Sequence, residues 1–162
     1  MPNGLHSASN YFMVSSMSTS TKKHSSGCLV AYGLDTFGDR WTLLILRDMV
    51  LYGMRRYGEF LSGEEKIATN ILADRLKHLE QEGIVVRTRD PENRRSYIYS
   101  LTDKGLDLVP VILEIIRWSG KYTPLTPGRK KLIARINDDC EELVREIHQR
   151  VHAVDPQSRG EG

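Results

Sequence analysis

Long hydrophobic runs are missing from this sequence of 162 residues. The two longest apolar stretches, residues 43–51 and 108–116, are interrupted by charged residues or by a proline. Both are shorter than the roughly 18 apolar residues of a membrane-spanning helix. The first 27 residues are rich in serine and threonine and lack the basic and apolar segments of a secretory signal. We therefore expect a cytoplasmic protein that does not enter a membrane.

Cysteine is scarce as well, with only Cys28 and Cys140 in the chain. Two cysteines far apart in sequence provide neither a disulfide framework nor the ligand spacing of a zinc site. The chain also lacks a glycine-rich phosphate-binding motif and a nucleophile with an obvious base, and His78 and His148 are isolated on predicted helices. We expect no metal, no cofactor and no enzymatic activity.

Neither sign of charge dominates, because the formal net charge is only +2. So small an excess does not indicate nucleic-acid binding, and the positions of the basic residues must decide that question. With 40% hydrophobic residues the chain can form one domain with a proper core. We predict unstructured tails at residues 1–27 and 154–162, a domain at residues 28–122 and a helical extension at residues 123–153.

The apolar segment at residues 40–52 predicts a central helix. Asp39 can cap its N-terminus and Gly53 can end it, and almost no polar face remains between them. A helix of this composition is expected to be buried on all sides. The shorter apolar segment at residues 28–38 predicts a first helix packed against it.

The segment at residues 67–83 predicts an amphipathic helix. Leu72, Leu76 and Leu79 recur with helical spacing, and Gly83 follows where the helix should end. Polar and small residues project from the opposite side or flank it. These residues are Thr69, Asn70, Ala73, Asp74, Lys77 and Gln81.

Two period-two segments, residues 84–90 and 96–101, predict a β-hairpin. The connection between them has no Asn-Gly pair, so its loop is expected to be longer than two residues. The tip of this hairpin carries Arg94 and Arg95 and no large apolar side chain.

Beyond the hairpin, Thr102 can cap one helix over residues 103–120, bent at Pro110. That helix has two apolar stripes, whereas a single domain needs only one for its core. We expect the second stripe to contact another copy of the chain, and it comprises Leu108, Ile112 and Ile115. A last amphipathic helix, with Thr126 as its N-cap, is predicted to extend to Val151.

This order of elements is typical of a winged helix-turn-helix, a mainly α fold with a small β-hairpin, here with flanking helices that form a dimer. In this fold one helix enters the major groove of DNA and the hairpin reaches a neighbouring groove. The predicted DNA-binding residues are Thr69, Asn70, Ala73, Asp74, Lys77, Arg94 and Arg95.

Each of these residues has an expected role. Thr69 and Asn70 lie at the end of the helix that approaches base edges, and asparagine can pair with adenine through two hydrogen bonds. Lys77 is expected to contact a phosphate. Arg94 and Arg95 are expected to meet phosphates or a narrow minor groove. The alternative for all of them is a solvated surface residue.

Asp74 needs a reason to face DNA, because its carboxylate is repelled by phosphates. It can accept a hydrogen bond from a cytosine amino group, or it can pair with Arg75 or Arg55. Arg55 and Arg56 are themselves either weaker phosphate contacts or solvated charges. The sequence leaves these alternatives open.

The chain from Cys28 to about Lys121 resembles the HxlR-type winged-helix transcriptional regulators of bacteria and archaea. The similarity is carried by the early cysteine, "GDRW", "RYGEF", "LADRLKHLEQEG", "YSLTDKG" and the proline-containing helix that ends in tryptophan. It implies a cytoplasmic homodimer that binds double-stranded DNA at a two-fold related operator and has no enzymatic activity. Leu29 stands where many members have proline, and the "DPENRR" turn is closer to MarR-type regulators.

Some members of that family sense oxidants through the early cysteine, and Cys28 matches that position. The resemblance therefore implies a redox sensor, whereas the alternative is a core cysteine. A cavity between the central helices and the last helix is expected to hold an unidentified small-molecule effector. The competing function is a winged-helix module that joins proteins and does not bind DNA.

Overall fold

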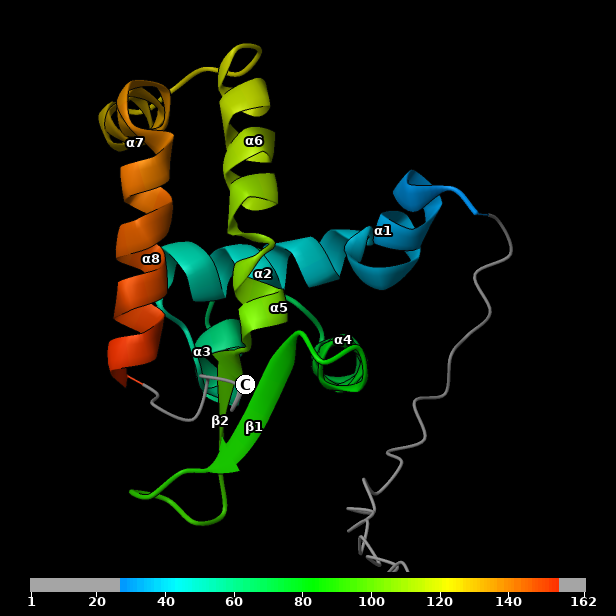
Figure 1. Ribbon diagram of the computed structural model, residues 1–162. Coiled ribbons are helices and arrows are strands. Elements are labelled where there is room, and N and C mark those ends of the chain that lie inside the picture. The colour runs from blue at the N-terminus through cyan, green and yellow to red at the C-terminus, as the bar shows by residue number, and fades with distance from the viewer. Residues whose placement is uncertain (1–26, 155–162) are drawn as a thin grey trace, which may run out of the picture.

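The computed structural model describes residues 27–154 and is mainly helical with one β-hairpin (Figure 1). The predicted fold class, a winged helix-turn-helix with flanking helices, is confirmed. The elements, in chain order, are α1 (Leu29–Phe37), α2 (Arg40–Tyr52), α3 (Tyr57–Leu61), α4 (Thr69–Gln81), β1 (Val85–Arg89), β2 (Tyr97–Leu101), α5 (Asp103–Leu106), α6 (Val109–Gly120), α7 (Pro127–Asp138) and α8 (Cys140–Val154). None of the helices described is long and apolar enough to cross a membrane. Apart from Gly27 and Val154, the predicted tails lie outside the described residues.

The central helix α2 begins and ends where the sequence predicts. The Asp39 side chain accepts hydrogen bonds from the backbone amides of Trp41 and Thr42, and Gly53 has the left-handed conformation that ends a helix, with a φ of 66°. Its buried residues form the middle of the core. However, Leu43 and Leu51 are only partly buried, so the expectation that α2 is enclosed on all sides is wrong for the single chain.

Helix α1 lies at the N-terminal end of α2 and projects from the body (Figure 1). Its only fully buried residue is Thr36. Leu29 is 87% exposed and Leu34 is 61% exposed. The prediction that α1 packs against α2 at the centre of the domain is therefore incorrect, and an apolar face of α1 is left uncovered in the single chain.

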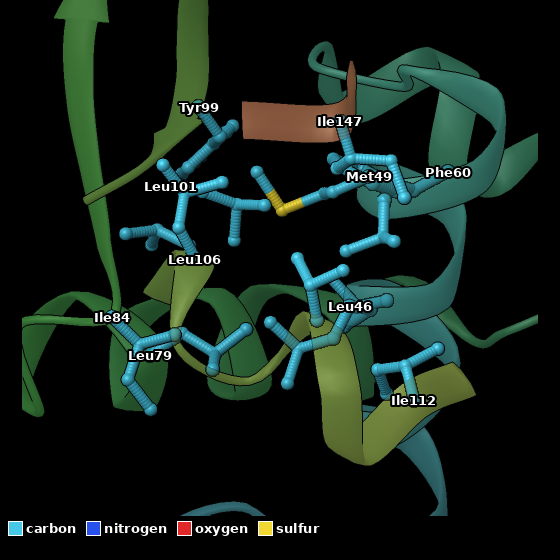
Figure 2. Packing of buried hydrophobic residues seen from close by; sticks show 14 of the residues in the cluster. Leu46, Met49, Phe60, Leu79, Ile84, Tyr99, Leu101, Leu106, Ile112 and Ile147 are labelled. Carbon is cyan, nitrogen blue, oxygen red and sulfur yellow. The ribbon is translucent and has the colours of Figure 1, made fainter. Parts of the chain in front are cut away.

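The amphipathic helix α4 packs its three leucines into the core as predicted. Leu72, Leu76 and Leu79 are fully buried, and Gly83 follows the helix with a φ of 67°. Figure 2 shows how the core joins the elements: Leu79 comes from α4, and Met49 extends from α2 toward Leu101 of β2. The core thus fixes α4 relative to the hairpin.

The hairpin pairs β1 and β2 antiparallel, with Val85 opposite Leu101 at the base and Arg89 opposite Tyr97 near the tip. The base is buried, and the loop at residues 90–96 protrudes beyond the other described elements (Figure 1). We call β1, β2 and this loop the wing. Helix α5 packs so closely on the base that a Cβ atom at Gly105 would lie 2.2 Å from the backbone oxygen of Ile84.

The predicted single helix over residues 103–120 is in fact two helices, α5 and α6. Thr102 caps the first as predicted, since its hydroxyl accepts a hydrogen bond from the Gly105 amide. Pro110 does not bend a continuous helix, because it lies in the first turn of α6. A proline there costs no backbone hydrogen bond, since the first helical amides have no intrahelical partner.

The predicted last helix is also divided, into α7 and α8. The Thr126 cap is confirmed, because its hydroxyl accepts from the Arg129 amide. The break occurs at Asp139, whose φ of −154° is not helical and whose side chain accepts from the Glu142 amide at 3.0 Å. Asp139 therefore acts as a new N-cap. Helices α6 and α7 lie at the end of the molecule opposite the wing loop, and α8 runs from there back along the body toward β2 (Figure 1).

Candidate nucleic-acid interface

The outward side of α4 is open to solvent. Its exposed residues are the predicted ones, namely Thr69, Asn70, Ala73, Asp74, Lys77 and Gln81. The start of α4 is open too, because Ala68 at the N-cap position provides no side-chain hydrogen bond to the first amides. Such amides favour an anion. The Tyr57 hydroxyl donates to the Thr69 carbonyl at 2.7 Å and ties α3 to this end of α4.

Asp74 has an arginine partner within the chain. The Arg75 guanidinium donates to the Asp74 carboxylate and also lies 3.3 Å from the Asp39 carboxylate at the start of α2. Of the alternatives for Asp74, pairing with Arg75 is therefore the one that the structure shows. Arg55 is engaged elsewhere, since it donates to the Ser100 hydroxyl at 2.6 Å. The Arg75 bridge joins the outer side of α4 to the central helix.

Hydrogen bonds within its own backbone fix the conformation of the loop of the wing. The Ser96 amide donates to the Asn93 carbonyl at 2.8 Å, and the Asp90 amide donates to the Ser96 carbonyl at 3.1 Å. Arg94 and Arg95 are both exposed, and neither forms an ion pair with any other residue in the described part of the chain. Their guanidinium groups are thus available to an external anion.

The root of the wing contains an ion pair that the sequence did not predict. Arg56 Nε lies 2.8 Å from the buried Asp90 carboxylate, and Arg56 Nη2 lies 3.3 Å from Glu92 Oε2. The hydrogen bond from Arg56 lowers the pKa of the Asp90 carboxyl below its ordinary value. We call the Arg56–Asp90 pair the wing latch. Arg56 is therefore ion-paired within its own chain, and its side chain is 43% exposed.

A groove of about 510 Å³ separates the outer side of α4 from the wing, and Ala73, Lys77, Arg87 and Tyr99 are among its lining residues. Arg87 Nε lies 3.0 Å from Glu80 Oε1. The guanidinium groups of Arg87 and Arg89 lie over the Tyr97 ring, 4.8 and 4.3 Å from its centroid. We call this hollow the α4–wing groove.

The DNA-binding residues predicted from the sequence do not include Arg87 and Arg89. Both are exposed on β1, and they extend the basic surface from the tip of the wing toward the α4–wing groove. A signal for them existed in the sequence. They alternate with Val86 and Thr88, so the period of two places them on one face of the strand.

The predicted dimer stripe is only partly free. Ile112 is 4% exposed and packs in the core of its own chain, so the expectation that it lies on an open surface is wrong. Leu108 is partly buried, and Ile115 is 43% exposed. The uncovered apolar surface of α6 lies farther toward its C-terminus, where Trp118 is 65% exposed and its ring lies 5.1 Å from that of Tyr122.

Cys28 is exposed directly before α1, so the interpretation as a core cysteine is incorrect. Cys140 is partly buried at the start of α8, and both thiols are free. Within residues 27–154 no group of three or more His, Cys, Asp or Glu residues could hold a metal ion.

Comparison with known proteins agrees with this architecture. The HxlR-like helix-turn-helix family model matches residues 36–127. The HTH-type transcriptional regulator YvaP of Bacillus subtilis is 37% identical over 89 residues, which are 55% of this chain and 82% of YvaP. The matched residues begin after Cys28 and end at the start of α7, so the early cysteine and the last two helices lie outside the family match.

Two solved structures are similar to the chain. The crystal structure of PA1607 has a TM-score of 0.56 and 38% identity, over 64% of this chain and 70% of PA1607. The redox regulator HypR in its oxidized form has a TM-score of 0.54 and 28% identity, over 60% of this chain and all of HypR.

Proposed function

The chain belongs to the HxlR-like helix-turn-helix family of transcriptional regulators, and we propose that it acts as a homodimer that binds a two-fold related DNA operator. The observation that carries this proposal is the exposed polar side of α4 next to a protruding wing, whose tip carries two arginines without an ion-pair partner among residues 27–154. A helix of this kind fits the major groove, and a wing fits the adjacent backbone or minor groove.

Within that complex, base recognition falls to the N-terminal part of α4. Thr69 and Asn70 reach base edges, and Ala73 offers a small apolar contact to a thymine methyl group. Asp74 faces DNA as an ion pair with Arg75, which reduces its repulsion of phosphates. Lys77, at the α4–wing groove, contacts a phosphate and positions the protein without reading sequence.

The uncovered apolar surfaces supply the dimer contact. The apolar face of α1 and the exposed residues of α6, Ile115 and Trp118, are large hydrophobic side chains in water in the single chain. A two-fold dimer would cover both surfaces with the same surfaces of a second copy. Its two α4 helices would then reach half-sites about 34 Å apart.

Oxidants are proposed to act on this dimer through Cys28. The thiol is exposed and immediately precedes α1, the helix with the uncovered apolar face. Modification at this position would change the dimer contact and hence the distance between the two α4 helices. Diamide should reduce operator affinity of the wild type and of Cys140→Ser but not of Cys28→Ser. An equal response of all three proteins would dismiss Cys28 as the sensor.

Selection of bound sequences from randomised DNA tests the main proposal. The expected result is an inverted repeat, because each subunit of a two-fold dimer reads the same half-site. Affinity for the selected site should also fall steeply with added salt, as phosphate contacts release counterions. No recovered motif and no binding at low salt would refute DNA recognition and favour a protein-binding module.

A further inference from the structure

A second hollow lies on the other side of the wing from the α4–wing groove. Its volume is about 200 Å³, and it is enclosed by the C-terminal end of α2, by β2 and by the last turns of α8. Most of its wall is apolar, with Met49, Met54, Leu101 and Val151 among the lining residues. A space of this size equals roughly seven water molecules at ~30 Å³ each, less than a drug-sized ligand needs.

Two arginines, Arg55 and Arg150, complete the lining, and the described residues that line the hollow include no carboxylate. Arg150 is held in place because it donates to the Val50 carbonyl at the end of α2. A guanidinium group has five N–H donors, so one hydrogen bond to the backbone leaves others for an anion. The wall thus offers an apolar interior and positive charge at one side.

We propose that this hollow binds a small carboxylic acid with an apolar body, such as one ring on a short chain, with its carboxylate on Arg150. The apolar part replaces water against Met49, Leu101 and Val151, and the carboxylate forms charge-assisted hydrogen bonds. Tyr99 lines both this hollow and the α4–wing groove, so an occupant touches the wall of the DNA-facing surface. The inference rests on the proposed function in one respect, since the acid would be the effector of that regulator.

The test is calorimetric titration of the full chain, without DNA, with 3-phenylpropanoate and with its neutral amide. Wild type should bind the acid at least about tenfold more tightly than the amide, the ratio expected for a hydrogen bond to a charged group. Arg150→Met keeps the aliphatic stem and should bring the two affinities within about twofold. Arg150→Lys keeps the charge and should retain the preference. Arg145→Met, on the same helix but outside the lining, is the matched control and should behave as wild type.

Several outcomes would overturn the proposal. Binding of neither compound, equal binding of both by wild type, or an acid preference that survives in Arg150→Met would each reject the site or its chemistry. Binding only after removal of residues 155–162 would show that the chain's own end is the occupant. A circular dichroism melt of each variant separates loss of binding from loss of folding. Because no DNA is present, failure here is distinct from failure to bind an operator.

Discussion

Replacing both arginines at the tip of the wing with alanine should flatten the salt dependence of DNA binding. Arg94 and Arg95 are exposed and unpaired among the described residues, so each can neutralise one phosphate. Each lost phosphate contact reduces the slope of log affinity against log salt by about 0.9. A dimer of Arg94→Ala/Arg95→Ala loses four contacts, or about 3.6 in slope. Between 50 and 200 mM salt, each contact corresponds to roughly a 3.5-fold change in affinity, so the variant should lose about 150-fold less affinity than wild type across that range.

The assay is fluorescence anisotropy with one labelled operator at several salt concentrations. The matched control is Lys130→Ala/Lys131→Ala, which removes the same charge from exposed residues of α7, at the end of the molecule opposite the wing (Figure 1). The control should keep the wild-type slope. Parallel slopes for wild type and the wing variant, or an equal change in the control, would refute the reasoning that the tip touches phosphates.

Five further substitutions test other parts of the structure. Asn70→Ala should reduce discrimination at one base pair by about 1–3 kcal/mol, whereas Lys77→Ala should lower the affinity for all DNA sequences alike. Competition with singly substituted operators distinguishes these results. Identical competition profiles for the two variants would contradict the assigned roles. Gly105→Ala should lower the free energy of unfolding in urea by about 1–3 kcal/mol, because the added carbon would lie 2.2 Å from a backbone oxygen. Asp90→Asn should lower the melting temperature at neutral pH. The pKa of Asp90 is lowered in the fold, so its carboxylate stabilises the protein above the ordinary carboxyl pKa and this contribution is lost as the pH falls through the lowered value; a difference from wild type that stays constant into acid would argue against the wing latch. Leu34→Lys should convert dimers to monomers in sedimentation equilibrium, and an unchanged mass would remove α1 from the dimer contact.

Much of the fold could be predicted because its signals are local. The ends of α2 follow from Asp39 and Gly53, which act within one helical turn. The exposed side of α4 follows from the spacing of its leucines, which fixes the opposite side as well. The wing follows from two alternating segments around a polar turn. In each case neighbouring residues decide the conformation, so the sequence is sufficient.

The parts that could not be predicted depend on distant residues or on a choice between local signals. The wing latch joins Arg56 to Asp90 across 34 positions, and no spacing rule indicates such a pair. Ile112 lies three residues after Val109 and next to Leu113 on one face of α6, so it belongs to the core stripe and not to a separate free stripe. At Asp139 the helical spacing continues through a residue that caps the next helix, and the cap prevails.

Tyr99 forms part of the wall of two hollows at once, one beside α4 and one beside α8. An acid that shifts the Tyr99 side chain from one hollow would therefore also change the wall of the other. Thermodynamic linkage is reciprocal, so any factor by which an acid changes DNA affinity is also the factor by which DNA changes acid affinity. Protein bound to an operator and protein free in solution would then bind the acid with different affinities, so each would be half-saturated at a different acid concentration.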